Sequence, residues 1–428
     1  MMNRPDAPHG MPAAAVAWLG VTLFLLTADH LALDLGGIKV KVGYAFVLGL
    51  WLFGPREMLA VARDALARLP RWPWLVLLPI LVSVALSHNL RSSLLWLAWL
   101  GFDGVTVLTV YAFAQAQRFG EREVRRAATI GTALVATSGL VQFAAIFLLD
   151  HPILDPQVHL GVYRLNGASG WPHFLAIYTF LLVPLVVAGT LSRAQLAVLA
   201  AILFVLAMST AKIAWLLAGG LVFVLLLLRR ARPLLPALVV AAPLAIAALL
   251  VPLPSRDGGT LSGADRLARY AGGALESTSI RDRLMIGEMG LAVFARYPWF
   301  GVGPRAYETY VWTRFDAELP GRNKLDVEGK VAAKHENIWI EFLTELGVPA
   351  TAGLLAILVR ALWVPGWRFA NALHAGAWSA LLLYFTVSGM LSQTGLLTLV
   401  YAVFGLYFHA RSLPPSAGAP TMRASLPP

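Results

Sequence analysis

Long apolar windows recur along nearly the whole sequence, and they constrain the fold more than any other feature. A helix needs about 20 predominantly apolar residues to cross the hydrocarbon core of a bilayer. Only 13% of the 428 residues are charged, whereas soluble proteins carry about 25%. Twelve windows can be delimited: residues 12–29, 39–54, 72–88, 92–115, 127–149, 172–191, 194–209, 211–228, 233–252, 336–362, 373–391 and 395–411.

Lipid admits only helices or closed barrels, and the alternating pattern of barrel strands is absent from these windows. The sequence therefore predicts an all-α polytopic membrane protein with about twelve transmembrane helices, forming a single transmembrane domain over residues 1–428. The first window is followed by Asp29 and lacks a small-residue cleavage site. We expect it to be a retained helix rather than a signal peptide.

The distribution of Lys and Arg predicts the orientation in the membrane. When the connections alternate between two sides, the side that holds the N-terminus collects 17 arginines. The short connections of the other side hold only Lys39, Lys41, Arg91, Arg164 and Lys212. Because cytoplasmic connections carry the excess of basic residues, both termini are expected in the cytoplasm. The net charge of +11 is then explained by residues near anionic membrane lipids, and it gives no reason to expect nucleic acid as a partner.

One connection is much longer than the others. Residues 254–335, between the ninth and tenth windows, fall on the non-cytoplasmic side and are rich in Tyr, Trp and Phe. Ser279 is a candidate N-cap for a helix over Ile280–Arg296, and Pro304 is well placed to open a second helix over Arg305–Phe315. We expect this segment to be a helical subdomain inserted into the membrane domain.

Five ionisable residues on the non-cytoplasmic side lie close to membrane depth. Ionisable groups in such places are costly, and they usually face a cavity or a partner. Arginine and lysine suit a phosphate or diphosphate, and an imidazole adds a titratable group. The five residues, which together predict a cationic site, are Arg164, Lys212, Arg281, Arg283 and His335.

Each of these residues also has a simpler explanation. Arg164 and Lys212 could be interfacial side chains that reach toward lipid headgroups. Arg281 and Arg283 are two residues apart and point in different directions on a helix, so one of them is expected to be an ordinary surface charge. His335 could be a loop histidine without a chemical role.

Motifs for other chemistries are absent from the sequence. The chain has no cysteine, no nucleotide-binding glycine motif and no zinc-binding helix motif. The nearest approach to a pair of metal-binding carboxylates is Asp326-Val327-Glu328, but hard cations usually need more oxygen ligands. We therefore expect neither a metal ion nor a cofactor.

Four stretches of sequence carry a resemblance to a known family. They are RLNGASGWPHFLAIY from Arg164, STAKIAWLL from Ser209, RLMIGEMGLAVFARYPWFGVGP from Arg283 and HENIWIEFLTELGVPA from His335. Their order and side of the membrane resemble the O-antigen ligase and O-antigen polymerase superfamily of bacterial envelope glycosyltransferases. The likeness covers roughly residues 164–347, together with the twelve-span layout and its large late loop.

The resemblance also has two departures. Lys212 stands where the family usually has arginine, and His335 is separated from Asn337 by Glu336, whereas the family often has His directly before Asn. Glu336 could simply favour the start of the next helix, or it could hold the position of the family's histidine. His335 is the first candidate for the base and Glu336 the second.

The resemblance implies a GT-C-like, metal-independent glycosyltransferase in the bacterial inner membrane, with its active site facing the periplasm. The donor would be O-antigen linked to undecaprenyl diphosphate, and the acceptor a sugar hydroxyl of lipid A–core. His335 or Glu336 would accept the hydroxyl proton. Arg164, Lys212 and Arg283 (or Arg281) would hold the diphosphate as its charge grows. The register of the third stretch favours Arg283 over Arg281.

Two alternatives stay open at this point. An O-antigen polymerase or a protein O-oligosaccharyltransferase would use the same donor and the same chemistry. A transporter of lipid-linked glycan would bind the diphosphate in a cationic cavity without breaking it.

Overall fold

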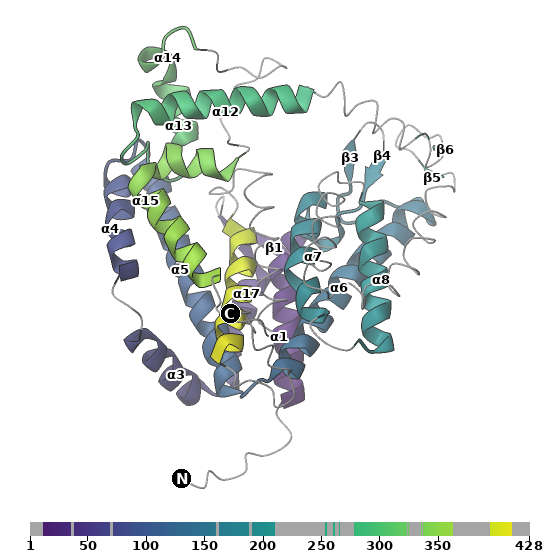
Figure 1. Cartoon of the computed structure of the whole chain (residues 1–428). Helices are drawn as coiled ribbons and strands as arrows, with labels where there is room; N and C mark the ends of the chain where they lie inside the picture. The colour runs from purple at the N-terminus through teal and green to yellow at the C-terminus, as the bar shows by residue number, and fades with distance from the viewer. Residues whose placement is uncertain are drawn as a thin grey trace, which may run out of the picture.

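The described part of the protein is a bundle of helices with three short hairpins, as the computed structural model shows (Figure 1). The structure describes residues 12–35, 38–68, 72–159, 162–187, 191–209, 253–254, 260–261, 265, 278–322, 324, 335, 337–362 and 394–412. The helices of the bundle are α1 (Pro12–Thr27), α2 (Val42–Gly49), α3 (Pro55–Ala67), α4 (Trp72–Ala85), α5 (Leu90–Ala116), α6 (Glu121–Phe147), α7 (Pro172–Val186), α8 (Arg193–Met208), α15 (Ile338–Leu362) and α17 (Thr394–Ser412).

The described residues also form three antiparallel two-stranded hairpins. They are β1 (Ala32–Leu35) with β2 (Ile38–Lys41), β3 (Gln157–His159) with β4 (Val162–Arg164), and β5 (Leu253–Pro254) with β6 (Thr260–Leu261). The second hairpin carries Arg164, one of the candidate site residues, and its register pairs Arg164 with Gln157.

Helices lie in nine of the twelve predicted windows. The windows 211–228, 233–252 and 373–391 lie outside the described residues. Among the described helices, three are long and apolar enough to cross a membrane: α5, α6 and Ile338–Ile357 of α15. The shorter apolar helices include α1, α7 and α8. An all-α membrane protein is supported, and the number of twelve spans stays a prediction.

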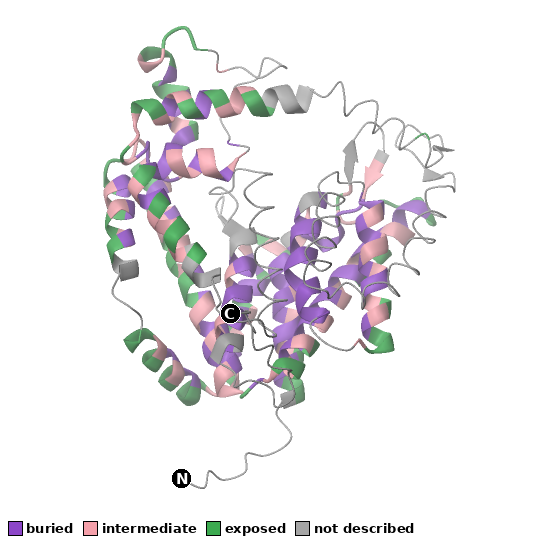
Figure 2. Cartoon of the chain, in the orientation of Figure 1, coloured by how far each residue is buried: buried purple, intermediate pink, exposed green. Residues whose placement is uncertain are grey.

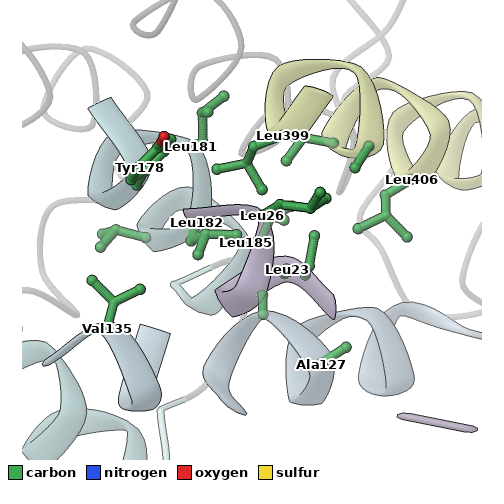
Figure 3. Packing of buried hydrophobic residues seen from close by; sticks show 14 of the residues in the cluster. Leu23, Leu26, Ala127, Val135, Tyr178, Leu181, Leu182, Leu185, Leu399 and Leu406 are labelled. Atoms are coloured by element: carbon green, nitrogen blue, oxygen red, sulfur yellow. The ribbon is translucent and has the colours of Figure 1, made fainter. Parts of the chain in front are cut away.

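The main hydrophobic core lies where α1, α6, α7 and α17 meet (Figure 3). Leu23 and Leu26 of α1 are fully buried and lie between side chains of the other three helices, such as Leu182 and Leu399. Buried residues are concentrated in this part of the bundle, whereas exposed residues are frequent along α3, α4 and α5 (Figure 2). Exposed leucines on α4 are expected in a helix that faces lipid.

The helix α15 is broken rather than straight, which corrects the prediction of one continuous span over 336–362. Gly347 has φ 76° and ψ 178°, a backbone conformation that is essentially restricted to glycine. Pro349 follows and cannot continue the hydrogen-bond ladder of the first segment. The first segment, Ile338–Leu346, lies beside α12 (Thr278–Arg296), and the second runs down along α4 (Figure 1).

The long loop contains helices, as predicted, but their bounds differ. The first is α12, which begins at Thr278, so Ser279 lies inside the helix and is not its N-cap. The second prediction, a helix over Arg305–Phe315, is wrong in its start and its length. The segment forms α13 (Tyr307–Thr313) and α14 (Phe315–Glu318), because Arg305 has φ 57° and cannot begin a right-handed helix.

Candidate functional site

The turn between α12 and α13 holds the loop against the membrane helices. Val302 N–H donates to the Thr344 carbonyl, and Gly303 N–H donates to the Glu345 carbonyl, both at 2.9 Å. A Cβ at Gly301 would lie 2.3 Å from the Glu345 carbonyl carbon, so only glycine permits this approach. The turn therefore fixes the loop to the first segment of α15.

The same turn also contacts the connection between α4 and α5. Ser93 Oγ donates to the Pro304 carbonyl at 2.6 Å, and His88 N–H donates to the Val302 carbonyl at 3.0 Å. The Asn89 side chain donates to Thr309 Oγ1 of α13 at 2.8 Å. The loop is thus held by two parts of the chain that are far apart in the sequence, namely the α4–α5 connection and the first segment of α15.

Glu345, in the first segment of α15, connects this segment to α13 and to α4. Its carboxyl oxygens accept from the backbone N–H groups of Arg305 (2.5 Å) and Tyr307 (3.3 Å), which lie at the start of α13. Its backbone carbonyl accepts from Ser83 Oγ of α4 at 2.9 Å. The side chain is buried, and acceptors are favourable at a helix N-terminus. Glu345 therefore sets where α13 begins, and α13 carries the residue that packs on His335.

His335 is buried between α12 and α13. Its ring packs on the Tyr307 ring with a centroid distance of 3.7 Å and an angle of 33°. On the other side, a Cβ at Gly290 would lie 3.1 Å from His335 Cε1. Within the described part of the chain, neither ring nitrogen of His335 has a hydrogen-bond partner. An imidazole held in this way keeps a nitrogen lone pair for an incoming donor.

Burial lowers the pKa of His335 to about 3, because the imidazolium form is poorly solvated there. At neutral pH the ring is therefore uncharged, which is the form that accepts a proton. Tyr307 is also buried, and its hydroxyl has no partner among the described residues. Burial raises the pKa of Tyr307 above its ordinary value, so the hydroxyl stays protonated.

The helix register distinguishes the two candidate arginines of α12. Arg283 is seven residues before Gly290, so both lie on the same face of the helix. Arg281 is nine residues before Gly290, which is half a turn away. Gly290 is the position that contacts His335 and Ile340. Arg283 is exposed, and the side chain of Arg281 lies outside the described part. The register puts Arg283 on the face of α12 that contacts His335, and its role in binding the donor stays a prediction.

Arg164 brings two of the four sequence stretches together. It is the last residue of β4, and its Nε donates to the Ser209 carbonyl at the end of α8, 3.4 Å away. Ser209 begins the stretch that contains Lys212. Lys212 itself lies outside the described residues, as does Glu336, so the structure tests neither.

The cations and the histidine come from different parts of the molecule. The hairpin β3–β4 lies across the top of the bundle from α13 and the start of α15 (Figure 1). The helix α12 runs across this top side, with its N-terminal end directed toward the hairpin (Figure 1). Arg283 is near that end of α12, and His335 packs against its middle at Gly290.

A buried pair of amides holds the segment that follows Arg164. Gln142 of α6 accepts from the backbone N–H groups of Asn166 (2.9 Å) and Gly167 (2.8 Å). Gln142 also donates to Asn166 Oδ1, and Asn166 donates to the carbonyls of Asp155 and Gly170. Both side chains are fully buried. The network determines the path of the chain from Arg164 to α7.

Replacing Gln142 with leucine is expected to destabilise the protein by about 2–4 kcal/mol, because two buried N–H groups lose their acceptor. Thermal unfolding of the detergent-solubilised protein would measure the loss. Gln195 is also buried but caps α8 at the other end of the bundle. A Gln195→Leu variant should be destabilised without affecting Arg164, so only Gln142→Leu should weaken donor binding. Equal donor binding in the two variants would contradict this role of Gln142.

Two residues of the site were not singled out from the sequence. Glu345 belongs to the Glu-x-Gly part of the fourth stretch, so the pattern contained a signal for it. Tyr307 is one of several aromatic residues in the long loop, and nothing in the sequence indicates that it packs on His335.

Residues 195–355 match the family model described as O-antigen ligase. The matched range contains most of α8, all of α12, α13 and α14, and most of α15, and it includes His335 and Arg283. No curated protein matches the chain. Over this range the match supports the resemblance to the O-antigen ligase and O-antigen polymerase superfamily, and members of the matched family are glycosyltransferase-like enzymes.

Proposed function

We propose that this protein is an O-antigen ligase that transfers a glycan from undecaprenyl diphosphate to a sugar hydroxyl of lipid A–core. The proposal places it in the bacterial inner membrane, with both termini in the cytoplasm and the site facing the periplasm. The observation that carries it is the buried imidazole of His335 at the entry to α15, whose ring nitrogens have no partner among the described residues, inside the range that matches the O-antigen ligase family.

The reaction needs a base and a site for a departing anion. A nitrogen of His335 would take the proton of the acceptor hydroxyl as its oxygen bonds to the anomeric carbon of the donor. The bond from that carbon to the diphosphate oxygen breaks, and the lipid diphosphate leaves with the electron pair. Arg283, Arg164 and Lys212 would stabilise its negative charge. Glu336 remains the second candidate for the base.

Both substrates are lipids, and this suits the position of the site. Their reactive heads lie in the same plane at the membrane surface, so much of the cost of bringing them together is removed. The segment Ile338–Leu346 and α12 form a layer across one end of the bundle (Figure 1). We infer that the candidate base lies at the surface where such heads meet.

The two arginines of α12 provide a matched test of donor binding. Arg283→Gln is expected to lower the transfer rate by about 10–100-fold, because a charge-assisted contact to the diphosphate is worth roughly 1.5–3 kcal/mol. Arg281→Gln, on the same helix, should change the rate little. Initial rates at several donor concentrations would compare them. If Arg281→Gln were the more damaging substitution, the assignment of the diphosphate to the Arg283 face would be wrong.

A reconstituted transfer assay tests the function itself. The purified protein would be mixed with undecaprenyl-diphosphate-linked O-polysaccharide and lipid A–core in the presence of a chelator. A glycan-bearing lipid A–core product would support a metal-independent ligase. Longer lipid-linked chains with unchanged lipid A–core would make the protein a polymerase. Movement of intact donor across a vesicle membrane without transfer would make it a transporter.

A further inference from the structure

The helix α3 has a seven-residue repeat that separates three kinds of side chain. Arg56-Glu57-Met58-Leu59 recurs as Arg63-Asp64-Ala65-Leu66. Residues seven apart lie on the same face of a helix. The helix therefore carries a leucine stripe, an arginine stripe and an acidic stripe, each made of two residues.

The three stripes are ordered around the helix. Arg63 is four residues after Leu59 and Arg56 is three residues before it, so the arginines lie beside the leucines. Glu57 and Asp64 are each two residues before a leucine, which places them on the opposite side. Arg68 pairs with Asp64 at 3.0 Å and so neutralises part of the acidic stripe.

The two leucines of the leucine stripe are largely left out of the packing among the described residues. The side of α3 that contacts the bundle carries Met58 and Ala62, which are buried. Leu59 and Leu66 are 63% and 50% exposed. An exposed leucine pair next to arginines matches the composition of helices that lie in a membrane interface.

A sharp bend sets the direction of α3. It forms an angle of 103° with the segment Val42–Phe53, and the bend is at Gly54, whose φ is 141°. The Gln117 side chain, just after α5, donates to the Phe53 carbonyl and holds the bend in place. The helix lies at the end of the bundle opposite α12, α13 and α14 (Figure 1). It therefore runs nearly perpendicular to the segment Val42–Phe53 at this end of the bundle.

We propose that α3 is an in-plane membrane helix that binds anionic lipid headgroups. Leu59 and Leu66 enter the acyl-chain boundary of the leaflet, Arg56 and Arg63 contact phosphate groups at the headgroup level, and Glu57 and Asp64 face water. Paired arginines bind phosphate oxygens well, and anionic leaflets attract such residues. The proposal does not depend on the glycosyltransferase function.

The absence of cysteine in the chain allows a direct test of depth. Single variants Leu59→Cys and Leu66→Cys, with Ala60→Cys as the matched control, would carry a nitroxide label in nanodiscs. We expect labels at 59 and 66 to be several-fold more accessible to oxygen, relative to a water-soluble nickel complex, than the label at 60. Equal accessibility at 59 and 60 would overturn the in-plane arrangement.

A second measurement tests the headgroup charge. The depth of the label at 59 would be compared in phosphatidylcholine and in mixtures with phosphatidylglycerol. We expect the anionic lipid to draw the label deeper, and the double variant Arg56→Gln/Arg63→Gln to reduce this response at least about fivefold. The control Glu57→Gln/Asp64→Asn should keep it. A lipid-exposed label that does not respond to headgroup charge would overturn the anionic specificity.

Discussion

Replacing His335 with alanine is expected to lower the rate of glycan transfer by about 10²–10⁴-fold, the usual contribution of a positioned general base. His335→Gln should lose as much, because its amide keeps the bulk and polarity but has no basic nitrogen. His151 is an exposed histidine in the connection after α6. His151→Ala is the matched control and should leave the rate unchanged.

Both His335 variants would be checked by thermal unfolding, so that a loss of folded protein is not mistaken for a loss of catalysis. A folded His335→Gln protein with the wild-type rate would exclude this imidazole as the base. Glu336 would then become the first candidate, with Glu336→Gln as the next variant to measure.

The pH dependence provides an independent test of the same group. An imidazole with the ordinary pKa of 6.5 would lose half of its basic form at pH 6.5, whereas burial lowers the pKa of His335 to about 3. The value of kcat/KM should therefore show no inflection near pH 6.5. An inflection there that disappears in His335→Gln would mean that the imidazole is solvated in the working enzyme.

The lowered pKa of His335 should also make the stability of the folded protein depend on pH. The folded-state pKa of His335 is lowered, so the unfolded state takes up its proton first as the pH falls. The stability that this neutral, buried ring contributes is present above pH 6.5 and is lost progressively as the pH falls from 6.5 toward 3.

Replacing Gly347 with alanine is expected to destabilise the protein by about 3 kcal/mol or more, since two costs add. The backbone conformation of Gly347 is closed to residues with a side chain, and a Cβ would lie 2.2 Å from the Trp299 carbonyl oxygen. Because the break in α15 is held at this point, we also expect transfer to be lost. The unfolding midpoint in detergent and the transfer rate would both be measured.

Gly101 provides the matched control for this substitution. It lies inside α5, and a Cβ there would meet no atom within 4 Å. Gly101→Ala should be neutral or stabilising by up to about 1 kcal/mol. If Gly347→Ala kept wild-type stability, the segments on either side of residue 347 would have to join in another way.

The length of the apolar windows predicted most helices of the bundle well. It failed where the chain changes direction inside a window. The window 336–362 is apolar on both sides of Gly347, so hydropathy alone indicates one span. The pair Gly347 and Pro349 was the local signal for a break. At Arg305 the sequence gives no such signal, because its left-handed backbone is imposed by contact with Glu345, which is distant in sequence.

The candidate site residues likewise divide into those with a signal in the sequence and those that depend on contacts between distant parts of the chain. The sequence predicts the arginines and the histidine as site residues because charge at membrane depth is rare and because four stretches resemble a family. The contact between Arg164 and Ser209 and the packing of Tyr307 on His335 arise from tertiary structure. Residues such as Gln142 look like ordinary polar residues of a helix until their partners are known.

The position of Glu345 has a consequence for exchanging parts between related enzymes. Its carboxyl group fixes the start of α13, and its carbonyl is bound by Ser83 of α4. The large loop is therefore not an independent module that could be transplanted to change specificity. In a chimera that exchanges only residues 254–335, a foreign turn would have to pack against the native α4, the native α4–α5 connection and the native first segment of α15. The smallest transferable unit would also include the end of α4 with Ser83, the α4–α5 connection and α15 as far as Gly347.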